Sequence, residues 1–518
     1  MYSLIIKKAT IIDGSGKKGF VGDVAIEDDK IVAVAPNITA SGKKIFDATD
    51  LVLSPGFIDV QNHSDSYWQL FDNPTLDSLT TQGFTTILVG NSGASLAPLI
   101  SEHSILSVQK WKSIRGMNVD WRTFSEYKAQ LSSKKYGTNV ASLVGYSTIR
   151  RGLLGDSTEP PSKSEMDSML EIIEGCLRAG AKGVSVGLQY SHELNVTHAE
   201  LFSLAELCVK HDKMLAVALR RESKTIVSSM EELCAVAEQT GVKLRISHLK
   251  IRYRENKDLL TQVLDTLESS WHRGAKIYFD SYPYDFTWQP LYTYLPTWSL
   301  EGGRAHLLEQ LSSFEKQEKI LSYLRNHAAN LSELIVTSTS QGLKVNGKTI
   351  ASIAKDMNLT SEQTILNIIK TGGSGTMVFD HCLDPKVVSI INNHSLGLIS
   401  TNGGGFNLEH SDNLTHPRSF GTSTKFLHNV IVNKEISLNE AIAKLTSRPA
   451  ELIGLPKRGL IKTGYFADLV LFNPQEIDSQ ASINNPYQYS SGIKAVWVNG
   501  QLTVSNSNPL GVSAGEFL

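Results

Sequence analysis

Side chains that could do chemistry stand at the ends of several apolar runs in this sequence. The run Phe57–Val60 closes on Gln61–His63, and a later run closes on His248. Imidazole is a common zinc ligand and a general acid or base near neutral pH. Buried strands of an α/β barrel deliver their functional residues at their C-terminal ends. The pattern therefore predicts one site built from the ends of several strands.

Eight short apolar runs between residues 55 and 440 alternate with segments of helical periodicity. They cover residues 57–60, 85–89, 139–145, 183–188, 214–219, 243–248, 276–280 and 396–402. Alternating strands and helices favour a parallel sheet, and eight such units are what a (β/α)8 barrel of the TIM type needs. We therefore predict an α/β protein with a barrel over residues 55–455.

Two further parts are predicted beside this barrel. Short β-prone runs separated by turn residues occupy both ends of the chain, and neither end has enough strands to bury a core alone. We expect residues 1–54 and 456–518 to pair into one composite β domain. The gap between the seventh and eighth runs is too long for one helix, so residues 287–342 are predicted to form an inserted, mostly helical subdomain.

The composition is that of an ordinary globular protein and excludes several functions. The chain has 518 residues, of which 41% are hydrophobic and 20% charged, and its formal net charge is -2. No basic cluster suggests nucleic acid, and no apolar run indicates a signal peptide or a bilayer span. The four cysteines are scattered without CxxC spacing, which favours free thiols in a reducing compartment. We expect a cytoplasmic protein without nucleic-acid or membrane partners; a homo-oligomer stays open.

Longer motifs run through nearly the whole chain. They are PGFID at 55–59, QGFTTILVGNSG at 82–93, GLQY at 187–190, RRE at 220–222, ISHLK at 246–250, YPY at 282–284, HPRSFGT at 416–422, AIAKLTSRPAELIGL at 441–455 and GYFADLVLF at 464–472. These motifs resemble those of the amidohydrolase superfamily and, within it, the D-aminoacylase (N-acyl-D-amino-acid deacylase) family. The resemblance implies a barrel hydrolase of non-peptide C–N bonds that uses zinc-activated water on an N-acyl-D-amino acid.

The resemblance also implies where a two-zinc site would lie. The metal-ligand positions are Gln61, His63, Ser92, Ala218 and His248, and the catalytic aspartate position is Asn402. Only the two histidines carry the family's residue type. Glutamine is a poor zinc ligand, a serine hydroxyl seldom ionises near neutral pH, and alanine coordinates nothing. The chain therefore predicts at most one zinc ion, and its asparagine cannot take a proton as aspartate would.

A second set of residues is predicted to contact substrate. It consists of Arg220, Arg221, Glu222, Tyr282, Tyr284, His416 and Arg418. Arginine pairs bidentately with carboxylates, so Arg220, Arg221 and Glu222 could clamp a carboxylate-bearing ligand. His416 and Arg418 follow the eighth run, where they could cap the loop or face the pocket. The RRE residues could equally form an ion-pair network, and the tyrosines could be packing at the barrel rim. Asp65 and Asp280 could replace a missing metal ligand, or they could form hydrogen bonds or salt bridges at the rim.

Two classes of function follow. The first is a hydrolase of the N-acyl-D-amino-acid deacylase type, with a small N-acyl amino acid as substrate. The second is a catalytically silent homologue that keeps the barrel to bind a small ligand or to act in assembly. Four substituted positions favour the second on mechanism, because together they remove the metal site. The resemblance over nearly the whole chain favours the first as classification.

Overall fold

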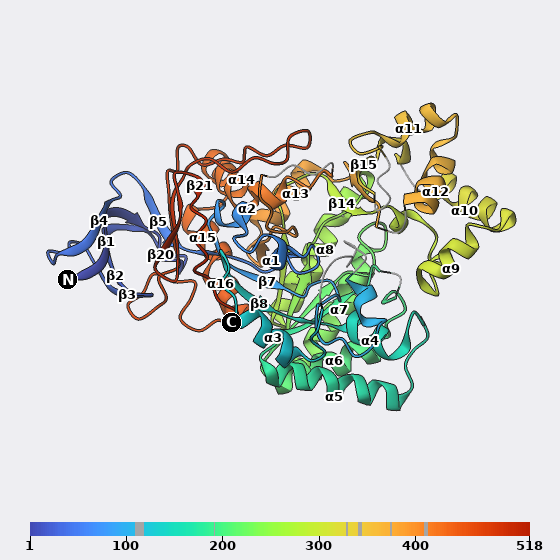
Figure 1. The fold of residues 1–518 in the computed structure, drawn as a ribbon, viewed down its shortest axis with the longest axis horizontal. Helices are drawn as coiled ribbons and strands as arrows, with labels where there is room; N and C mark the ends of the chain where they lie inside the picture. Colours follow the sequence, from blue (N-terminus) through green and yellow to red (C-terminus); the bar gives the residue numbers. More distant parts are fainter. Residues whose placement is uncertain (109–118, 191, 328–329, 340–343, 373–374, 409–412) are drawn as a thin grey trace.

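Eight parallel strands form a closed barrel at the centre of the computed structural model (Figure 1). The structure describes residues 1–108, 119–190, 192–327, 330–339, 344–372, 375–408 and 413–518. The barrel strands are β6 (Phe57–Asp59), β7 (Phe84–Val89), β8 (Asn139–Ser142) continued by β9 (Val144–Gly145), β10 (Gly183–Gly187), β11 (Met214–Ala218), β12 (Lys243–Ser247), β13 (Ile277–Ser281) and β17 (Gly397–Ile399).

Hydrogen bonding closes this ring. Strands pair in the order β6-β7-β8 in one sheet and β9-β10-β11-β12-β13-β17 in another. Only Leu143 separates β8 from β9, so the two sheets are continuous there. At the opposite edge a parallel bridge between Asn62 and Gly403 joins the segments that follow β6 and β17. The predicted α/β barrel is therefore confirmed.

Neighbouring strands end together, so the residues that follow them meet at one end of the barrel, called the barrel mouth below. Gly187 of β10 pairs with Ala218 of β11, and Ala218 pairs with Ser247 of β12. Strands in a parallel barrel are covered on both faces, which is why β7, β10 and β11 are buried at every residue and show no alternation of buried and exposed positions.

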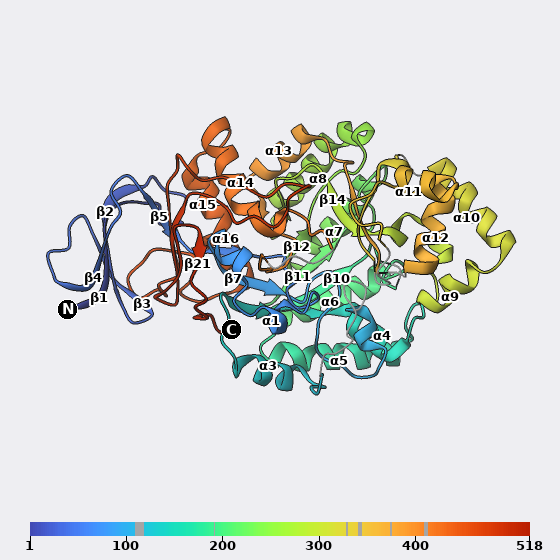
Figure 2. The same cartoon turned by 45° about the horizontal axis from the view of Figure 1, so that its top comes forward.

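Helices surround the barrel (Figures 1 and 2). The longer ones are α3 (Phe124–Ser132), α4 (Tyr146–Leu154), α5 (Lys163–Ala179), α6 (His198–Lys210), α7 (Ile226–Thr240), α8 (Leu260–His272), α13 (Pro385–Asn393), α14 (Arg418–Asn433), α15 (Leu438–Leu445) and α16 (Ser447–Ile453). Short turns are α1 (Gln69–Asp72), α2 (Asp77–Thr80), η1 (Ser104–Ser107) and η2 (Arg254–Leu259). A capping box of Ser162 with Glu165 begins α5, and Gly180 in the left-handed region ends it.

Strands from both ends of the chain share one nine-stranded sheet. They are β1 (Tyr2–Ile11), β2 (Phe20–Glu27), β3 (Lys30–Ala35), β4 (Gly42–Asp47), β5 (Val52–Pro55), β18 (Leu469–Phe472), β19 (Ile493–Val498), β20 (Gln501–Ser505) and β21 (Asn508–Pro509). β5 pairs antiparallel with β18, which joins the two ends. Figures 1 and 2 show the blue and dark red strands together at one side of the barrel.

The segment between β13 and β17 has a hydrophobic core of its own, which runs from Leu291 to Val378. Its elements are β14 (Thr287–Pro290), η3 (Leu291–Tyr294), η4 (Thr297–Ser299), α9 (Gly303–Gln310), α10 (Phe314–His327), η5 (Leu331–Glu333), β15 (Ile335–Ser338), α11 (Ile350–Met357), α12 (Ser361–Gly372) and β16 (Met377–Asp380). This core continues past residue 342 because α11, α12 and β16 also contribute apolar side chains to it.

Two further findings concern the cysteines and the helices. Cys176, Cys208, Cys234 and Cys382 are all buried and free. Within the described part of the chain, every helix is too short or too polar to cross a membrane.

Candidate functional site

A buried arginine crosses the barrel interior beneath the mouth. Arg245 of β12 is fully buried, and its guanidinium donates hydrogen bonds to the carbonyl oxygen of Val60. It also donates to Oε1 of Gln61 at 2.5 Å and to Oδ1 of Asn91 at 2.6 Å. Its Nε lies 3.3 Å from Oδ1 of Asp280 on β13. Since β12 and β6 are not neighbours in the ring, this side chain links separate sides of the barrel.

His63 is bonded to Asn402, the residue predicted to stand at the position of a catalytic aspartate. Its Nε2 lies 3.0 Å from Oδ1 of Asn402, which follows β17. Nε2 of Gln61 donates a hydrogen bond to Oγ of Ser92 at 3.2 Å, from the end of β6 to the end of β7. All four side chains are buried. These polar groups thus form two pairs between strand ends.

Three of the predicted site residues have a left-handed backbone. The φ angle is 56° at Ser92, 42° at His248 and 44° at Asn402. Residues other than glycine are uncommon in this region, and such strain, of order 1–3 kcal/mol each, gathers at functional sites. Each of these residues closely follows a barrel strand, so the strain coincides with the barrel mouth.

His248 belongs to a buried ion-pair cluster. Oε1 of Glu222 lies 3.2 Å from Nδ1 of His248 and 2.5 Å from Nζ of Lys250. Nε2 of His248 lies 3.5 Å from Nε2 of Gln189. Burial alone would raise the pKa of Glu222, but Lys250 and His248 outweigh burial and hold that pKa at about 2. Both ring nitrogens of His248 therefore already face protein groups.

The two arginines of the RRE motif lie apart from this cluster. Nη2 of Arg220 donates hydrogen bonds to Oε1 of Glu232 at 2.7 Å and to the carbonyl oxygen of Val196 at 2.8 Å. Arg221 is exposed, and its Nη1 donates to the carbonyl oxygen of Arg220 at 3.1 Å. Of the two alternatives open for Arg220, the structure has the ion pair. Ala218, the last residue of β11, contributes only a methyl group.

Arg418 and His416 lie in an aromatic cluster. The His416 ring stacks on Phe286 with centroids 4.2 Å apart, and its Nδ1 accepts the backbone N–H of Arg418 at 3.0 Å. The guanidinium of Arg418 lies 4.8 Å from the ring centroid of Tyr282 and 5.9 Å from that of Trp288. Arg418 is 3% exposed, and its Nε has no hydrogen-bond partner among the described residues. Burial and the charge of Arg418 lower the pKa of His416 well below its usual range.

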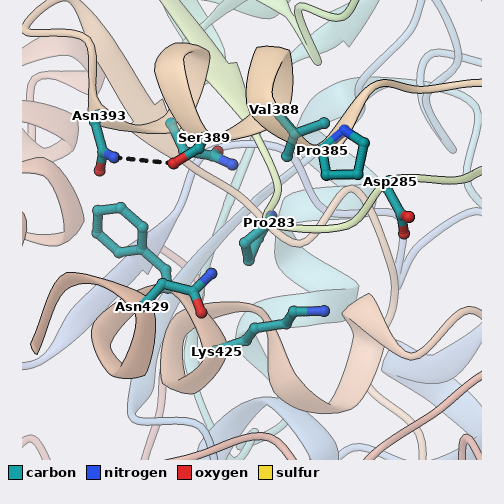
Figure 3. Close-up of a pocket in the computed structure, with 10 residues that line it drawn as sticks. Pro283, Asp285, Pro385, Val388, Ser389, Asn393, Lys425 and Asn429 are labelled. Carbon is teal, nitrogen blue, oxygen red and sulfur yellow. Dashed lines mark hydrogen bonds between the residues drawn. The ribbon is translucent and has the colours of Figure 1, made fainter. Parts of the chain in front are cut away.

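The hydroxyl of Tyr284 contacts the residue before Arg418 and the C-terminal segment. It donates a hydrogen bond to the carbonyl oxygen of Pro417 at 3.3 Å and lies 3.3 Å from Oγ of Ser479. A pocket of about 260 Å³ opens beside it, between α13 and α14 (Figure 3). Its ten lining residues, which include Asp285 and Lys425, contain none of the predicted site residues.

The donor set at the mouth does not fit a metal ion. Asp65 accepts the backbone N–H of Gly90 at 2.9 Å, and Asp59 accepts hydrogen bonds from Asn62 at 2.8 Å and Thr401 at 2.5 Å. Burial raises the pKa of both aspartates to about 6. In the described residues, no group of three or more His, Cys, Asp or Glu side chains could hold a metal. His63 and His248 are engaged elsewhere, as described above.

Two residues that shape the mouth were missed by the sequence analysis. Lys250 closes the ISHLK motif, so the motif itself was an available signal. Arg245 is a charged residue between the apolar residues Leu244 and Ile246 of a predicted barrel strand, which could have indicated a side chain with a buried counter-charge.

Known proteins that resemble this chain include amidohydrolases and deacylases. A family model described as the amidohydrolase family matches residues 410–504. N-acyl-D-aspartate deacylase of Alcaligenes xylosoxydans xylosoxydans is 29% identical over 502 residues, which cover 96% of this chain and 91% of that protein. D-aminoacylase of the same organism is 27% identical over 518 residues, covering 100% of this chain and 97% of that protein.

Solved structures agree on the fold. A crystal structure of D-aminoacylase has a TM-score of 0.84 at 25% identity and covers 100% of both chains. N-acyl-D-glutamate deacylase from Bordetella bronchiseptica, complexed with zinc and a phosphonate inhibitor, has a TM-score of 0.84 at 24% identity and covers 100% of this chain and 99% of that chain. The chain is therefore a relative, at about 27% identity over its full length, of the D-aminoacylases and N-acyl-D-amino-acid deacylases of the amidohydrolase family.

Proposed function

We propose that the barrel mouth binds an N-acyl amino acid and that the protein is a D-aminoacylase-like hydrolase of non-peptide C–N bonds. Relatives at 29% and 26% identity are named deacylases of N-acyl-D-aspartate and N-acyl-D-glutamate. Such molecules are small amides with free carboxylates. The observation that carries the proposal is Arg418, a buried guanidinium for which the described residues provide no carboxylate partner.

The surroundings of Arg418 favour an anionic ligand. A buried charge without a counter-charge is costly, and the contact with the Tyr282 ring offsets only part of that cost. A ligand carboxylate would supply two acceptors that match the planar guanidinium. Tyr67 stacks on Trp288 with ring centroids 5.4 Å apart and adds an apolar surface for an acyl group.

Calorimetric titration with N-acetyl-D-aspartate, N-acetyl-D-glutamate and N-acetyl-D-leucine tests this binding. Arg418→Gln should weaken binding at least about tenfold, because a charged hydrogen-bonded pair contributes roughly 1.5–3 kcal/mol. Arg220→Gln is the matched control, since its guanidinium is already paired with Glu232. Equal affinity for the corresponding ligand amides, which lack the carboxylate, would contradict the proposal.

Binding without hydrolysis is the second candidate, and the donor set at the mouth favours it. Relatives of known structure are described with zinc or with a binuclear metal centre. Here His63 is bonded to Asn402, and Gln61 is bonded to Arg245. Asn402 has no ionisable group with which to take a proton from water. We therefore assign no catalytic step to a metal.

Release of free amino acid from the same N-acetyl compounds separates the two candidates. Zinc-dependent turnover by the unaltered chain would support the deacylase. Calorimetric binding without turnover would support the silent homologue, and the absence of both would refute the proposed ligand class.

A further inference from the structure

We propose that Arg245 is the permanent cation of the barrel mouth and that it keeps divalent metal ions out. The inference rests on the barrel interior alone, holds for any ligand bound at the mouth, and favours binding without hydrolysis over the zinc-dependent deacylase. It goes beyond the missing ligands, because it names the positively charged group that is bonded to Gln61, one of the predicted metal-ligand positions.

The guanidinium already uses the oxygen atoms that a cation would need. Oε1 of Gln61 and Oδ1 of Asn91 both accept from its Nη2, and the carbonyl oxygen of Val60 accepts from its Nη1. These oxygens come from the ends of β6 and β7, and Arg245 reaches them from β12. Arginine stays protonated at every accessible pH, so no change of pH vacates the position.

Asp280, the negative charge nearest to the guanidinium, is also already bonded. Asp280 lies 3.3 Å from Nε of Arg245 through Oδ1, and its Oδ2 accepts a hydrogen bond from Oγ of Ser400 at 2.5 Å. Both members of the ion pair are fully buried. A divalent ion would have to break this pair or stand beside the guanidinium, where low dielectric makes the repulsion strong. Burial lowers the pKa of Arg245, and the charges of Asp280 and Asp59 offset part of that effect.

The first measurement uses the unaltered protein. After incubation with zinc or manganese and dialysis, elemental analysis should find far less than one equivalent of either metal. The thermal unfolding midpoint should be the same with metal as with EDTA. Retention of one or more equivalents per chain, or a clear rise in the midpoint with either metal, would overturn the proposal.

The second measurement removes the guanidinium. Arg245→Met should lower the midpoint in EDTA, because Asp280 loses its partner, and zinc or manganese should recover part of that loss. Carboxylate and amide oxygens suit manganese, which makes it the more sensitive probe. Arg150→Met is the matched control: Arg150 is 1% exposed and donates to the carbonyl oxygens of Ser157, Glu159 and His192. Its loss should destabilise the protein without creating a response to metal.

A double variant separates charge from packing. Arg245→Met combined with Asp280→Asn removes both buried charges, so it should unfold at a higher temperature than Arg245→Met and show no metal response. An equal loss of stability for Arg245→Met in EDTA and in metal would mean that the arginine is only structural and would refute the proposal. If that variant does not fold, metal retention by the unaltered protein decides the question.

Discussion

Nε2 of His63 lies 3.0 Å from Oδ1 of Asn402, so an uncharged amide from the last barrel strand holds the imidazole that follows the first. An amide oxygen accepts a hydrogen bond but carries no charge and takes no proton from water. This contact positions the histidine without providing a general base.

Asn402→Asp should therefore be insufficient to create a deacylase. The carboxylate would provide a base, but Ser92 and Ala218 would still leave a metal without ligands. We expect no measurable release of amino acid from N-acetyl-D-amino acids when zinc is present, measured by chromatography. Turnover by this single variant above that of the unaltered chain would contradict the expectation.

Restoring the whole ligand set should succeed only when Arg245 is also removed. The fourfold variant Gln61→His, Ser92→Cys, Ala218→His and Asn402→Asp places zinc donors at the strand ends, yet it keeps the guanidinium beside them. We expect zinc below one equivalent in that variant and a gain of bound zinc after Arg245→Met is added. Elemental analysis measures this, and stoichiometric zinc in the fourfold variant would argue against exclusion by the arginine.

The Glu222 cluster should make stability depend on acid pH. The folded-state pKa of Glu222, about 2, lies below the ordinary value of 4.5. The contribution of Glu222 to the free energy of unfolding is therefore present above pH 4.5 and is lost as pH falls toward 2. Urea unfolding of wild type and Glu222→Gln should give free energies that converge over this window. The raised pKa values of Asp59 and Asp65 affect both proteins equally. A constant difference between the two curves would remove Glu222 as the cause.

The buried ion pair between Arg458 and Asp468 should matter far more than a surface pair. Both side chains are 4% exposed, and Asp468 also accepts the backbone N–H of Asn499 at 2.8 Å. Asp468→Ala should cost about 3–5 kcal/mol in the free energy of unfolding, because it leaves a buried guanidinium unpaired. Glu476→Gln, which breaks the more exposed pair with Lys494, should leave stability nearly unchanged. Equal effects of the two changes in urea unfolding would count against this account.

The barrel strands could be predicted because burial on both faces makes most of their residues apolar. The runs at 183–188 and 214–219 correspond to β10 and β11 within one residue at each end. The extent of the subdomain between β13 and β17 was harder to predict. The length of the segment indicated an insertion, but it could not show that α11 and α12 contribute to the same hydrophobic core.

The site could be predicted only in part. Strand-end motifs brought His63 and Asn402 into one site, and the structure places them in direct contact. Alternation along a strand predicts which face of the sheet a side chain occupies. It does not predict how far an arginine side chain extends across a closed barrel, so the partners of Arg245 could not be predicted from the sequence. The two arginines after β11 also have different surroundings: Arg221 is exposed, whereas Arg220 pairs with Glu232. Both lie in a loop, where the two-residue period of a strand no longer predicts which way a side chain faces.

The pairing of β5 with β18 has a consequence for synthesis in the cell. Val52 pairs with Phe472, and 420 residues (472 minus 52) separate them along the chain. At roughly 5–20 residues per second, a ribosome needs about 20–80 seconds to make that stretch. Throughout that interval one edge of β5 lacks its antiparallel partner and exposes backbone groups that could pair with another chain. The newly made N-terminal strands are therefore where we expect chaperones to be needed most.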